Sequence, residues 1–349
     1  MLHIPRGLAA YLTAFTVLMA APPAQAQQRT PTTVVIASFG GNLDKVYAEA
    51  LAPFLDARNI VVKWVPSSSL ENAAKVVATA GRPEYDLVLF DNLAYSLASS
   101  KGVLAKVDEA VVTNYKDLDR RAQLPRRDGV PVGFYVAGLM YNTQEFAKRG
   151  WTPPTGWADL FRPEFCDVLG LANVNYAPGV AMLVMLAGGD INKVPQAIEK
   201  MSTLKNCVQT LEEASPKLEE KTQMGVYLVG LAASTRVPAL ALQNVPVKFV
   251  FPREGTLFGN GTISVVKGAP NEKLAQEISN YLIGPQAQTI LMSKAFYVPT
   301  NTKVKLLPQL LEYGLPSPEQ MGRLITVSDD EVLARRRGWQ RDLQRAMAR

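Results

Sequence analysis

Long hydrophobic runs are almost absent from this sequence, and their absence limits what the chain can be. The only extended apolar stretch covers residues 8–21, and two prolines separate it from an A-x-A pattern at residues 24–26. A membrane-spanning helix needs about 20 consecutive apolar residues. We therefore interpret residues 1–26 as a cleaved signal peptide, with a membrane anchor as the alternative. No later run is long enough to cross a bilayer, so we expect an exported protein that is soluble in the periplasm.

Histidine is also nearly absent, since the sequence contains one, His3, within the expected signal peptide. The mature chain then lacks the commonest general base and the commonest metal ligand near neutral pH. This excludes catalysis by Ser–His or Cys–His pairs. No G-x-S-x-G motif and no metal-ligand cluster occurs in the sequence. We therefore expect no enzymatic activity, no metal site and no cofactor.

Cysteine is scarce, and the two that occur are Cys166 and Cys207. In an oxidising periplasm, two thiols in the same part of the chain are expected to form a disulfide. The alternative of two free thiols stays open at this point, because a bridge requires Cα atoms that lie close together. The role of such a bridge would be structural.

Acidic residues are fewer than basic ones, 31 against 37, and the formal net charge is +6. Much of the excess lies at the end of the chain, in arginines 335, 336, 337, 341, 345 and 349. A basic run of this kind can bind nucleic acid, but export removes that partner. We interpret the run as the solvent-exposed face of a C-terminal helix and expect no nucleic-acid partner.

Strands and helices alternate in the first third of the mature chain. Apolar, β-branched runs predict strands at residues 33–37, 60–64 and 85–90, and helical spacing follows the first two. This alternation predicts a parallel, doubly wound sheet. Ligands bind outside the carboxyl ends of the strands in such sheets. The loops at that position cover residues 38–42, 66–69 and 91–92.

Residues 27–349 exceed what one hydrophobic core usually supports, so we expect two lobes. An extended crossing segment at 129–143 precedes a second α/β unit, a helix is expected over 272–293, and a last crossing over 296–301. We predict an α/β fold with two lobes, each a mainly parallel sheet flanked by helices, joined by crossing hinge strands. The predicted ranges are 27–131 with 251–297 for the first lobe, and 132–250 with 298–349, including C-terminal helices, for the second.

Five short segments resemble the spermidine/putrescine-type branch of the extracellular solute-binding proteins of ABC transporters. The segments are SFGG at 38–41, YDLV at 85–88, GLMYNT at 138–143, FPREG at 251–255 and YVPTN at 297–301. Their order and spacing match across nearly the whole mature chain. The resemblance implies the type II periplasmic binding fold, in which a solute is held between two hinged lobes and delivered to the membrane permease subunits of an importer. We expect a monomer.

The resemblance also indicates what the solute is. Polyamine binders of this branch carry a tryptophan and an acid where Gly259 and Gly261 stand here, so a polyamine is disfavoured. Arg236 follows a predicted strand, at a position where some related amino-acid and opine binders use arginine to hold a carboxylate. An ordinary surface arginine with an ion-pair partner is the alternative. We expect a carboxylate-bearing polar solute, such as an amino acid, an opine or an organic acid.

Other candidate ligand-binding residues follow predicted strands or flank the crossings. The glycine loop could offer N–H groups and a hydroxyl to an anion, or it could simply be a turn that needs glycine. Asp91 could bind a hydroxyl or amine, or it could cap the next helix. The tyrosines could equally be packing residues. The candidates besides Arg236 are Ser38, Phe39, Gly40, Gly41, Asn42, Asp91, Asn92, Tyr135, Asn173, Tyr176, Ser234, Asn260, Thr262 and Tyr297.

Several other functions remain open for the same fold. Ferric iron is disfavoured, because the mature chain has no histidine and no Tyr-Tyr pair. A glycine loop together with Arg236 also suits phosphonates and other anions. A binding protein that signals to a membrane receptor would have the same cleft as one that feeds a transporter.

Overall fold

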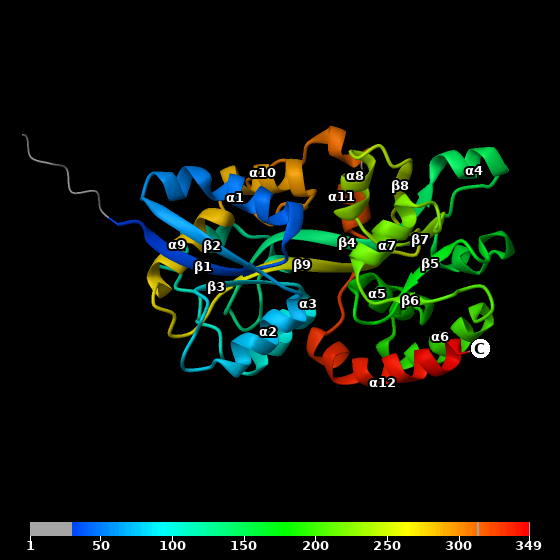
Figure 1. Cartoon of the computed structure of the whole chain (residues 1–349), viewed down its shortest axis with the longest axis horizontal. Helices are drawn as coiled ribbons and strands as arrows, with labels where there is room; N and C mark the ends of the chain where they lie inside the picture. Colours follow the sequence, from blue (N-terminus) through cyan, green and yellow to red (C-terminus); the bar gives the residue numbers. More distant parts are fainter. Residues whose placement is uncertain (1–29, 313, 349) are drawn as a thin grey trace, which may run out of the picture.

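A computed structural model of the chain describes residues 30–312 and 314–348 (Figure 1). The expected signal peptide, residues 1–26, lies outside this part. Three parallel strands form the first part of the sheet, and they are β1 (Thr32–Ser38), β2 (Ile60–Pro66) and β3 (Leu87–Phe90). The helices that pack on this part are α1 (Gly41–Asp56), α2 (Ser69–Ala78), α3 (Asn92–Ser100), α9 (Glu272–Leu282) and α10 (Pro285–Ala295).

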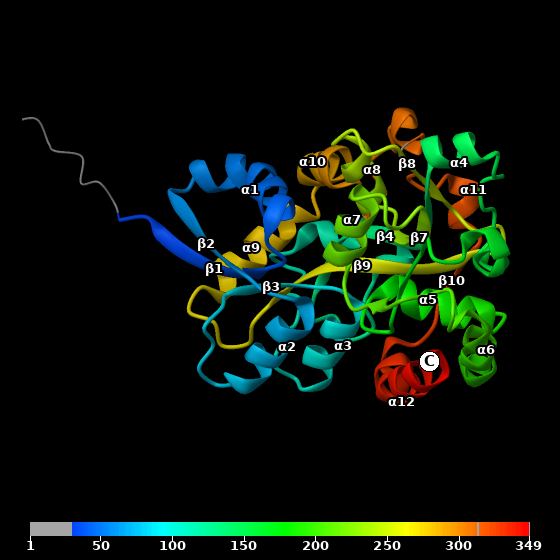
Figure 2. The same ribbon diagram turned by 45° about the vertical axis from the view of Figure 1, so that its right-hand side comes forward.

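Two long strands, β4 (Val130–Asn142) and β9 (Thr256–Val265), run antiparallel through the middle of the molecule. The strand order is β2-β1-β3-β9-β4-β7-β5-β6, so β9 and β4 connect one half of the sheet to the other. Figure 2 shows both strands extending from the N-terminal half into the other half. β4 is the crossing strand expected over residues 129–143, whereas β9 at 256–265 was not predicted as a crossing strand from the sequence.

The second half repeats the α/β arrangement. Its strands are β5 (Leu169–Ala172), β6 (Leu211–Glu212), β7 (Val229–Ala233) and β8 (Val247–Val250). β5 is parallel to β6 and β7, whereas β7 and β8 are antiparallel to β4. The helices of this half are α4 (Thr143–Arg149), α5 (Ala177–Leu186), α6 (Val194–Met201), α7 (Ser215–Gln223) and α8 (Arg236–Ala241).

The end of the chain returns across both halves. It contains α11 (Pro318–Met321), β10 (Leu324–Ile325), which pairs with β9, and α12 (Asp329–Met347), which packs on both α3 and α6. Short 3₁₀ helices occur at Thr113–Asp117, Arg120–Ala122, Trp157–Phe161, Pro163–Phe165, Ile191–Lys193, Ser202–Leu204 and Pro308–Leu311. The described part contains no helix long and apolar enough to cross a membrane.

Two elements differ from the sequence prediction. The single helix expected over 272–293 is two helices, because the turn at Gly284 separates α9 from α10 and Pro285 starts the second one. The last crossing is not a regular strand. Val298 exchanges two backbone hydrogen bonds of 2.8 Å with Phe134 and forms only an isolated bridge to β4.

The buried residues divide between the two halves, as expected for two lobes. β4 contributes Phe134 to a core under α1, α9 and α10, and Leu139 to a second core that contains α5 and α12. Leu310 and Leu315 pack in the first core, although we expected everything after residue 297 to belong to the second lobe. The packing therefore favours a later boundary, and the exact division into lobes remains a proposal.

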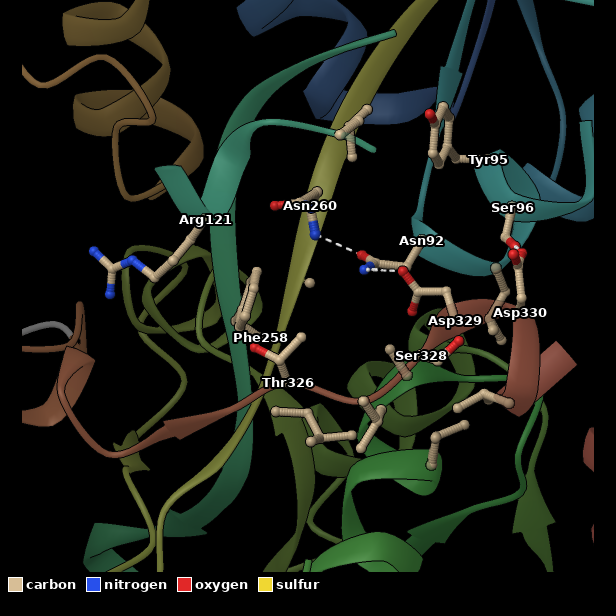
Figure 3. A pocket seen from close by; sticks show the side chains of 18 of the residues that line it. Asn92, Tyr95, Ser96, Arg121, Phe258, Asn260, Thr326, Ser328, Asp329 and Asp330 are labelled. Atoms are coloured by element: carbon tan, nitrogen blue, oxygen red, sulfur yellow. Dashed lines mark hydrogen bonds between the residues drawn. The ribbon is translucent and has the colours of Figure 1, made fainter. Parts of the chain in front are cut away.

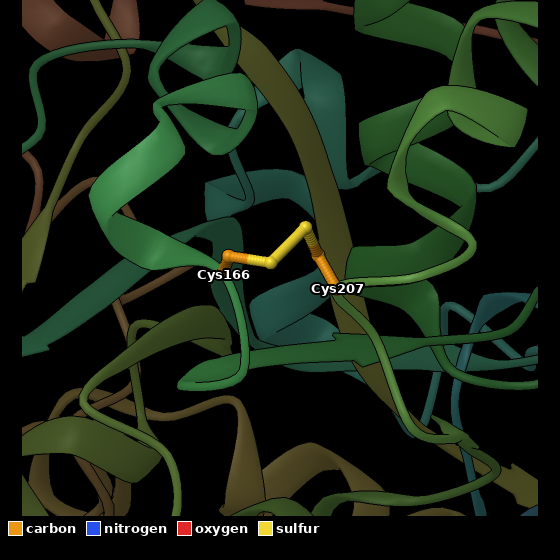
Figure 4. Close-up of a disulfide and its surroundings, with 2 residues drawn as sticks. All are labelled: Cys166 and Cys207. Atoms are coloured by element: carbon orange, nitrogen blue, oxygen red, sulfur yellow. A yellow bond between two sulfur atoms is a disulfide. The ribbon is translucent and has the colours of Figure 1, made fainter.

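The disulfide expected from the sequence is present and joins Cys166 to Cys207 (Figure 4). Their Cα atoms are 4.4 Å apart, and the backbone N–H of Asp167 donates to the Cys207 carbonyl at 3.0 Å. Phe165 and Val208, which flank the bridge, are buried in the second core. The bridge therefore ties the segment before β5 to the segment before β6.

Candidate functional site

The candidate site lies where the two halves of the sheet meet. β1 and β3 are parallel to each other in the first half, and β5 and β7 are parallel to each other in the second half. Each of these four strands ends in a loop, and β4 and β9 cross between the two halves. Side chains at the carboxyl ends of parallel strands gather at one edge of a sheet. The loops that follow these four strands carry most of the residues predicted from the sequence.

Three tyrosines from three segments form the centre of the site. Tyr135 comes from β4, Tyr176 precedes α5, and Tyr297 follows α10. Tyr135 and Tyr176 are partly buried, Tyr297 is 6% exposed, and burial raises the pKa of all three. Their hydroxyl groups therefore stay protonated at physiological pH and can both donate and accept hydrogen bonds.

Glycines on β9 make room for these rings. A Cβ atom at Gly259 would overlap the ring of Tyr135, and one at Gly261 would lie 2.8 Å from the Tyr297 hydroxyl oxygen. This explains why the larger residues expected in polyamine binders are absent here. The rings of Tyr135 and Tyr297 occupy the space that side chains at 259 and 261 would need.

Arg236 is the first residue of α8 and supplies a cation near the tyrosines. Its Nε lies 3.6 Å from Oε1 of Glu219, and 42% of its side chain remains exposed. Burial lowers the pKa of Arg236, but Glu219 and the tyrosines Tyr176, Tyr297 and Tyr135 raise it more, so the group stays charged. An ion pair this long leaves the guanidinium able to bind a further acceptor.

Asp91 supplies an acid from the other half of the molecule. It caps α3 by accepting the Ala94 N–H at 3.0 Å, and its own N–H donates to Ser69 Oγ at 2.9 Å. The capping role weighed from the sequence is therefore confirmed. Burial raises the pKa of Asp91, and its charge acts on Tyr135 and Tyr297. The carboxylate is thus both a cap and a neighbour of the tyrosine cluster.

Two donors of the glycine loop after β1 are bound within the protein. The Ser38 hydroxyl and the Gly40 N–H donate to the two oxygens of Asp44, at 2.6 and 3.0 Å. Asp44 lies in the first turn of α1, where an acid interacts favourably with the helix N-terminus. Gly40 has a φ of 78°, so the expectation that the turn needs glycine is confirmed. Gly41 and Asn42 are exposed, and Phe39 packs at the edge of the first core.

Three other predicted residues are buried, and two of them accept hydrogen bonds from backbone N–H groups. Ser234 is fully buried and accepts the Val136 N–H at 3.1 Å, so it joins β7 to β4. Asn173 is 3% exposed and accepts the Asn175 N–H at 2.8 Å, which shapes the loop before α5. Thr262 is 1% exposed on β9. These side chains were expected in the site because they end or follow strands; they are buried in the structure, and their contact with a solute stays a prediction.

Asn92 connects three segments of the chain. Its Oδ1 accepts the Asn260 N–H at 2.6 Å, and its Nδ2 donates to Oδ2 of Asp329 at 3.0 Å. Figure 3 shows both bonds. Asn92 therefore fixes the start of α3 to β9 and to the C-terminal segment, and one N–H and one lone pair of its amide remain for a further contact.

A cavity of about 710 Å³ adjoins the tyrosine cluster. Tyr135 and Gly259 belong to its wall, and the segment before α12 closes one side (Figure 3). Asn260, which is 5% exposed, also lines the cavity, and its Oδ1 has no hydrogen-bond partner among the described residues. A cavity between two lobes with this volume suits a small organic molecule.

Sequence reasoning missed three acids that contact predicted residues. Glu219 and Asp329 come from other segments of the chain, and Asp44 lies in the first turn of α1, just after the glycine loop. Asp44 had a signal in the sequence, because an acid in the first turn after a glycine loop is typical of a helix start. In residues 30–312 and 314–348, no three acidic, cysteine or histidine side chains gather in a way that could hold a metal ion.

Asp329 is expected to make stability depend on pH. Its pKa is raised to about 6, chiefly by burial and also by the charges of Asp91 and Asp330, whereas the hydrogen bond from Asn92 opposes this change. An acid whose pKa is higher in the folded state stabilises the fold fully below its unfolded pKa, 3.8, and this contribution disappears as the pH rises through about 6. We predict that Asp329→Asn gains stability relative to the unmodified protein between pH 4 and pH 8, measured as the difference in melting temperature.

Replacing the adjacent Asp330 provides a control, because its effect on stability should change with pH in the opposite direction. Hydrogen bonds from Ser96 and Arg126 hold its pKa below the usual range. Its stabilising contribution is therefore present at neutral pH and lost as the pH falls. Asp330→Asn should lose stability relative to the unmodified protein as the pH rises. The same trend with pH in both variants would contradict our assignment of Asp329.

Comparisons with known proteins agree with this architecture. Residues 49–315 match the family described as bacterial extracellular solute-binding protein. The chain is 25% identical over 264 residues to spermidine/putrescine-binding periplasmic protein 1 of Haemophilus influenzae, covering 70% of each protein. It is 24% identical over 312 residues to the gamma-aminobutyric acid-binding protein of Pseudomonas aeruginosa, covering 85% of this chain and 84% of that protein.

A solved structure shows the same fold. The crystal structure of the binding protein MotA from A. tumefaciens B6, in complex with glucopine, superimposes with a TM-score of 0.73 at 19% identity. The match covers 90% of this chain and all of that one. The type II periplasmic binding fold expected from the sequence is confirmed. The chain belongs to the bacterial extracellular solute-binding protein family.

Proposed function

We propose that this protein captures a solute in the periplasm and delivers it, as a monomer, to the membrane permease subunits of an ABC importer. The family, the relatives named as periplasmic binding proteins and the disulfide all support an exported binding protein. β4 and β9 act as the hinge between the lobes. A solute that contacts both lobes favours the closed form by its differential affinity for that form.

The solute that the site favours bears a carboxylate. The single observation behind this proposal is Arg236, a partly exposed guanidinium beside Tyr135, Tyr176 and Tyr297, whose one ion pair within the described residues is the 3.6 Å contact to Glu219. A guanidinium presents two parallel N–H groups to a carboxylate, and tyrosine hydroxyls can donate to its remaining lone pairs. Amino acids, opines and organic acids all carry this group.

Asp91 narrows the class further. Its carboxylate lies in the opposite half of the molecule from Arg236, and both act on Tyr135 and Tyr297. A solute with an amine and a carboxylate would place its ammonium toward Asp91 and its carboxylate toward Arg236. A polyamine has no partner for Arg236, and the guanidinium would repel it. We therefore favour an amino acid or an opine over an organic acid or a polyamine.

A thermal-shift screen tests this proposal directly. The purified protein is screened against amino acids, opines, organic acids, phosphonates, polyamines and ferric citrate. A ligand present at 100 times its dissociation constant stabilises the folded protein by about 2.7 kcal/mol. We expect a raised melting temperature with amine-bearing carboxylates. A response to polyamines or iron alone would keep the binding function but reject the proposed role of Arg236.

A further inference from the structure

Arg336 lies on the inner face of the C-terminal helix α12. Val332, Trp339 and Leu343 are the buried residues of this helix. Position 336 lies four residues after the first and three before the second, so it shares their face. We expected the arginine run to be exposed to solvent, but Arg335 and Arg336 are both partly buried in the structure. Burial lowers the pKa of Arg336, and its Nε is buried without a hydrogen-bond partner among the described residues.

One end of the Arg336 guanidinium holds the loop before α5. Its Nη1 donates to Oδ1 of Asn175 at 2.7 Å, and the Asn175 N–H donates to Oδ1 of Asn173. Tyr176, which belongs to the tyrosine cluster, is the next residue of this loop. Arg336 therefore fixes a segment of the second half that carries a candidate solute contact.

The start of α12 is fixed to the first half of the molecule. Asp329 accepts a hydrogen bond from Asn92, and Asp330 accepts one from Ser96, both on α3. Arg336 follows Asp329 by seven residues, which is two helical turns and returns to the same face. The helix thus carries Arg336 from α3 toward the loop at Asn175, and in this position the guanidinium also interacts with Asp91, the N-cap of α3.

We propose that Arg336 is a positioning residue of the solute site, which fixes the loop that carries Tyr176 and places a permanent positive charge beside Asp91. This inference rests on the proposed function, because it gives Asp91 the role of binding the solute's ammonium group. It makes the C-terminal helix a functional wall of the site instead of a solvated basic tail.

The charge of Arg336 matters because Asp91 is buried. Burial raises the pKa of Asp91, whereas the N–H groups of α3, the Ser69 hydroxyl and Arg336 oppose this change. Without Arg336, Asp91 would become protonated at a higher pH, and a neutral carboxyl group attracts an ammonium group only weakly. The titratable and charged groups that face Asp91 are Arg336 and Asp329 from α12, Tyr135 from β4 and Tyr297 from the segment after α10.

Two readouts test this role, and the first needs no solute. The titration of the Asp91 carboxyl carbon is followed by ¹³C NMR in the solute-free protein and in three variants. Arg336→Gln removes the charge, Arg336→Lys keeps it, and Arg337→Gln removes the exposed charge next to it. We expect the Asp91 midpoint to rise in Arg336→Gln, and to stay near that of the unmodified protein in the other two.

The second readout compares 4-aminobutanoate with butanoate, which differ only in the ammonium group. The affinity of each protein for 4-aminobutanoate is measured at pH 5.5 and at pH 8. We expect the affinity of Arg336→Gln, divided by that of the unmodified protein at the same pH, to be at least about threefold lower at pH 5.5 than at pH 8. Butanoate should show no such difference. An unchanged Asp91 midpoint in Arg336→Gln overturns the proposed role of Arg336, whatever the protein binds. If the unmodified protein binds no amine-bearing carboxylate, the proposed function fails, and the NMR titration still decides on Arg336.

Discussion

Replacing Arg236 by alanine is expected to weaken solute binding by about 10- to 100-fold while leaving the fold intact. Hydrogen bonds to charged groups contribute about 1.5–3 kcal/mol, and each 1.4 kcal/mol corresponds to about tenfold in affinity. The loss to stability should be small, because the ion pair of Arg236 with Glu219 is 3.6 Å long and partly open to solvent. Calorimetric titration with a hit from the solute screen measures the first effect, and thermal unfolding measures the second.

Arg149 provides a matched control for this experiment. Its Nε lies 3.1 Å from Glu145, its side chain is 43% exposed, and it belongs to α4, outside the site. Arg149→Ala therefore removes the same charge from a similar environment, and affinity should not change. Arg236→Lys separates charge from geometry, because lysine keeps the charge but cannot present two parallel N–H groups. If Arg236→Ala bound the solute as well as Arg149→Ala does, Arg236 would not be a ligand of the carboxylate.

The fold could be predicted from local patterns because alternation and periodicity are local properties. The run at residues 33–37 and the nearly continuous apolar run at 85–90 are β1 and β3 in the structure. The crossing expected at 129–143 is β4. The split between α9 and α10 also had a local signal, since Gly284 and Pro285 end one helix and start another. Helical periodicity continues on both sides of this pair, so the two helices were predicted as one.

The site could be predicted only where it follows strand ends. That rule selected Tyr176 and Arg236, which lie near each other after the parallel strands β5 and β7, and Asp91, which follows β3 in the other half and lies near Tyr135. It also selected Ser234, although a side chain at a strand end can equally turn inward to a neighbouring strand. The position of Ser234 after a strand does not show where its side chain points, because the pairing of β7 with β4 determines that orientation.

The arginine run was interpreted from its composition as solvent-exposed, although its helical spacing to buried residues is also present in the sequence. Within a run of three arginines, Arg335 and Arg336 both fall within three or four residues of Val332 and Trp339, and only Arg337 points away from that helical face. The contact of Arg336 with Asn175 depends on where α12 packs, and this position is fixed by contacts between segments more than 150 residues apart. Helical phase could have separated Arg335 and Arg336 from the exposed Arg337, but it could not have identified the partner of Arg336.

Removing the disulfide is expected to destabilise the protein by about 4 kcal/mol. The bridge closes a loop between residues 41 positions apart, and opening it returns conformational entropy to the unfolded chain. The double variant Cys166→Ser, Cys207→Ser avoids a leftover reactive thiol. Equilibrium unfolding in urea should show a lower midpoint for this variant, and the unmodified protein with reductant present throughout should show the same shift. Equal midpoints with and without the bridge would mean that the reduced unfolded chain already restricts this loop.

The position of the disulfide predicts which part of the protein loses stability when the disulfide is removed. Cys166 and Cys207 precede β5 and β6, and their neighbours Phe165 and Val208 belong to the second core. Hydrogen exchange in the double variant should therefore become faster at the amides of β5 and its neighbours. The amides of β1 and β3 lie in the first half and share no core with the bridge. If they exchanged faster to the same extent, the two halves would unfold as one cooperative unit, and the hinge strands would couple their stability as well as their motion.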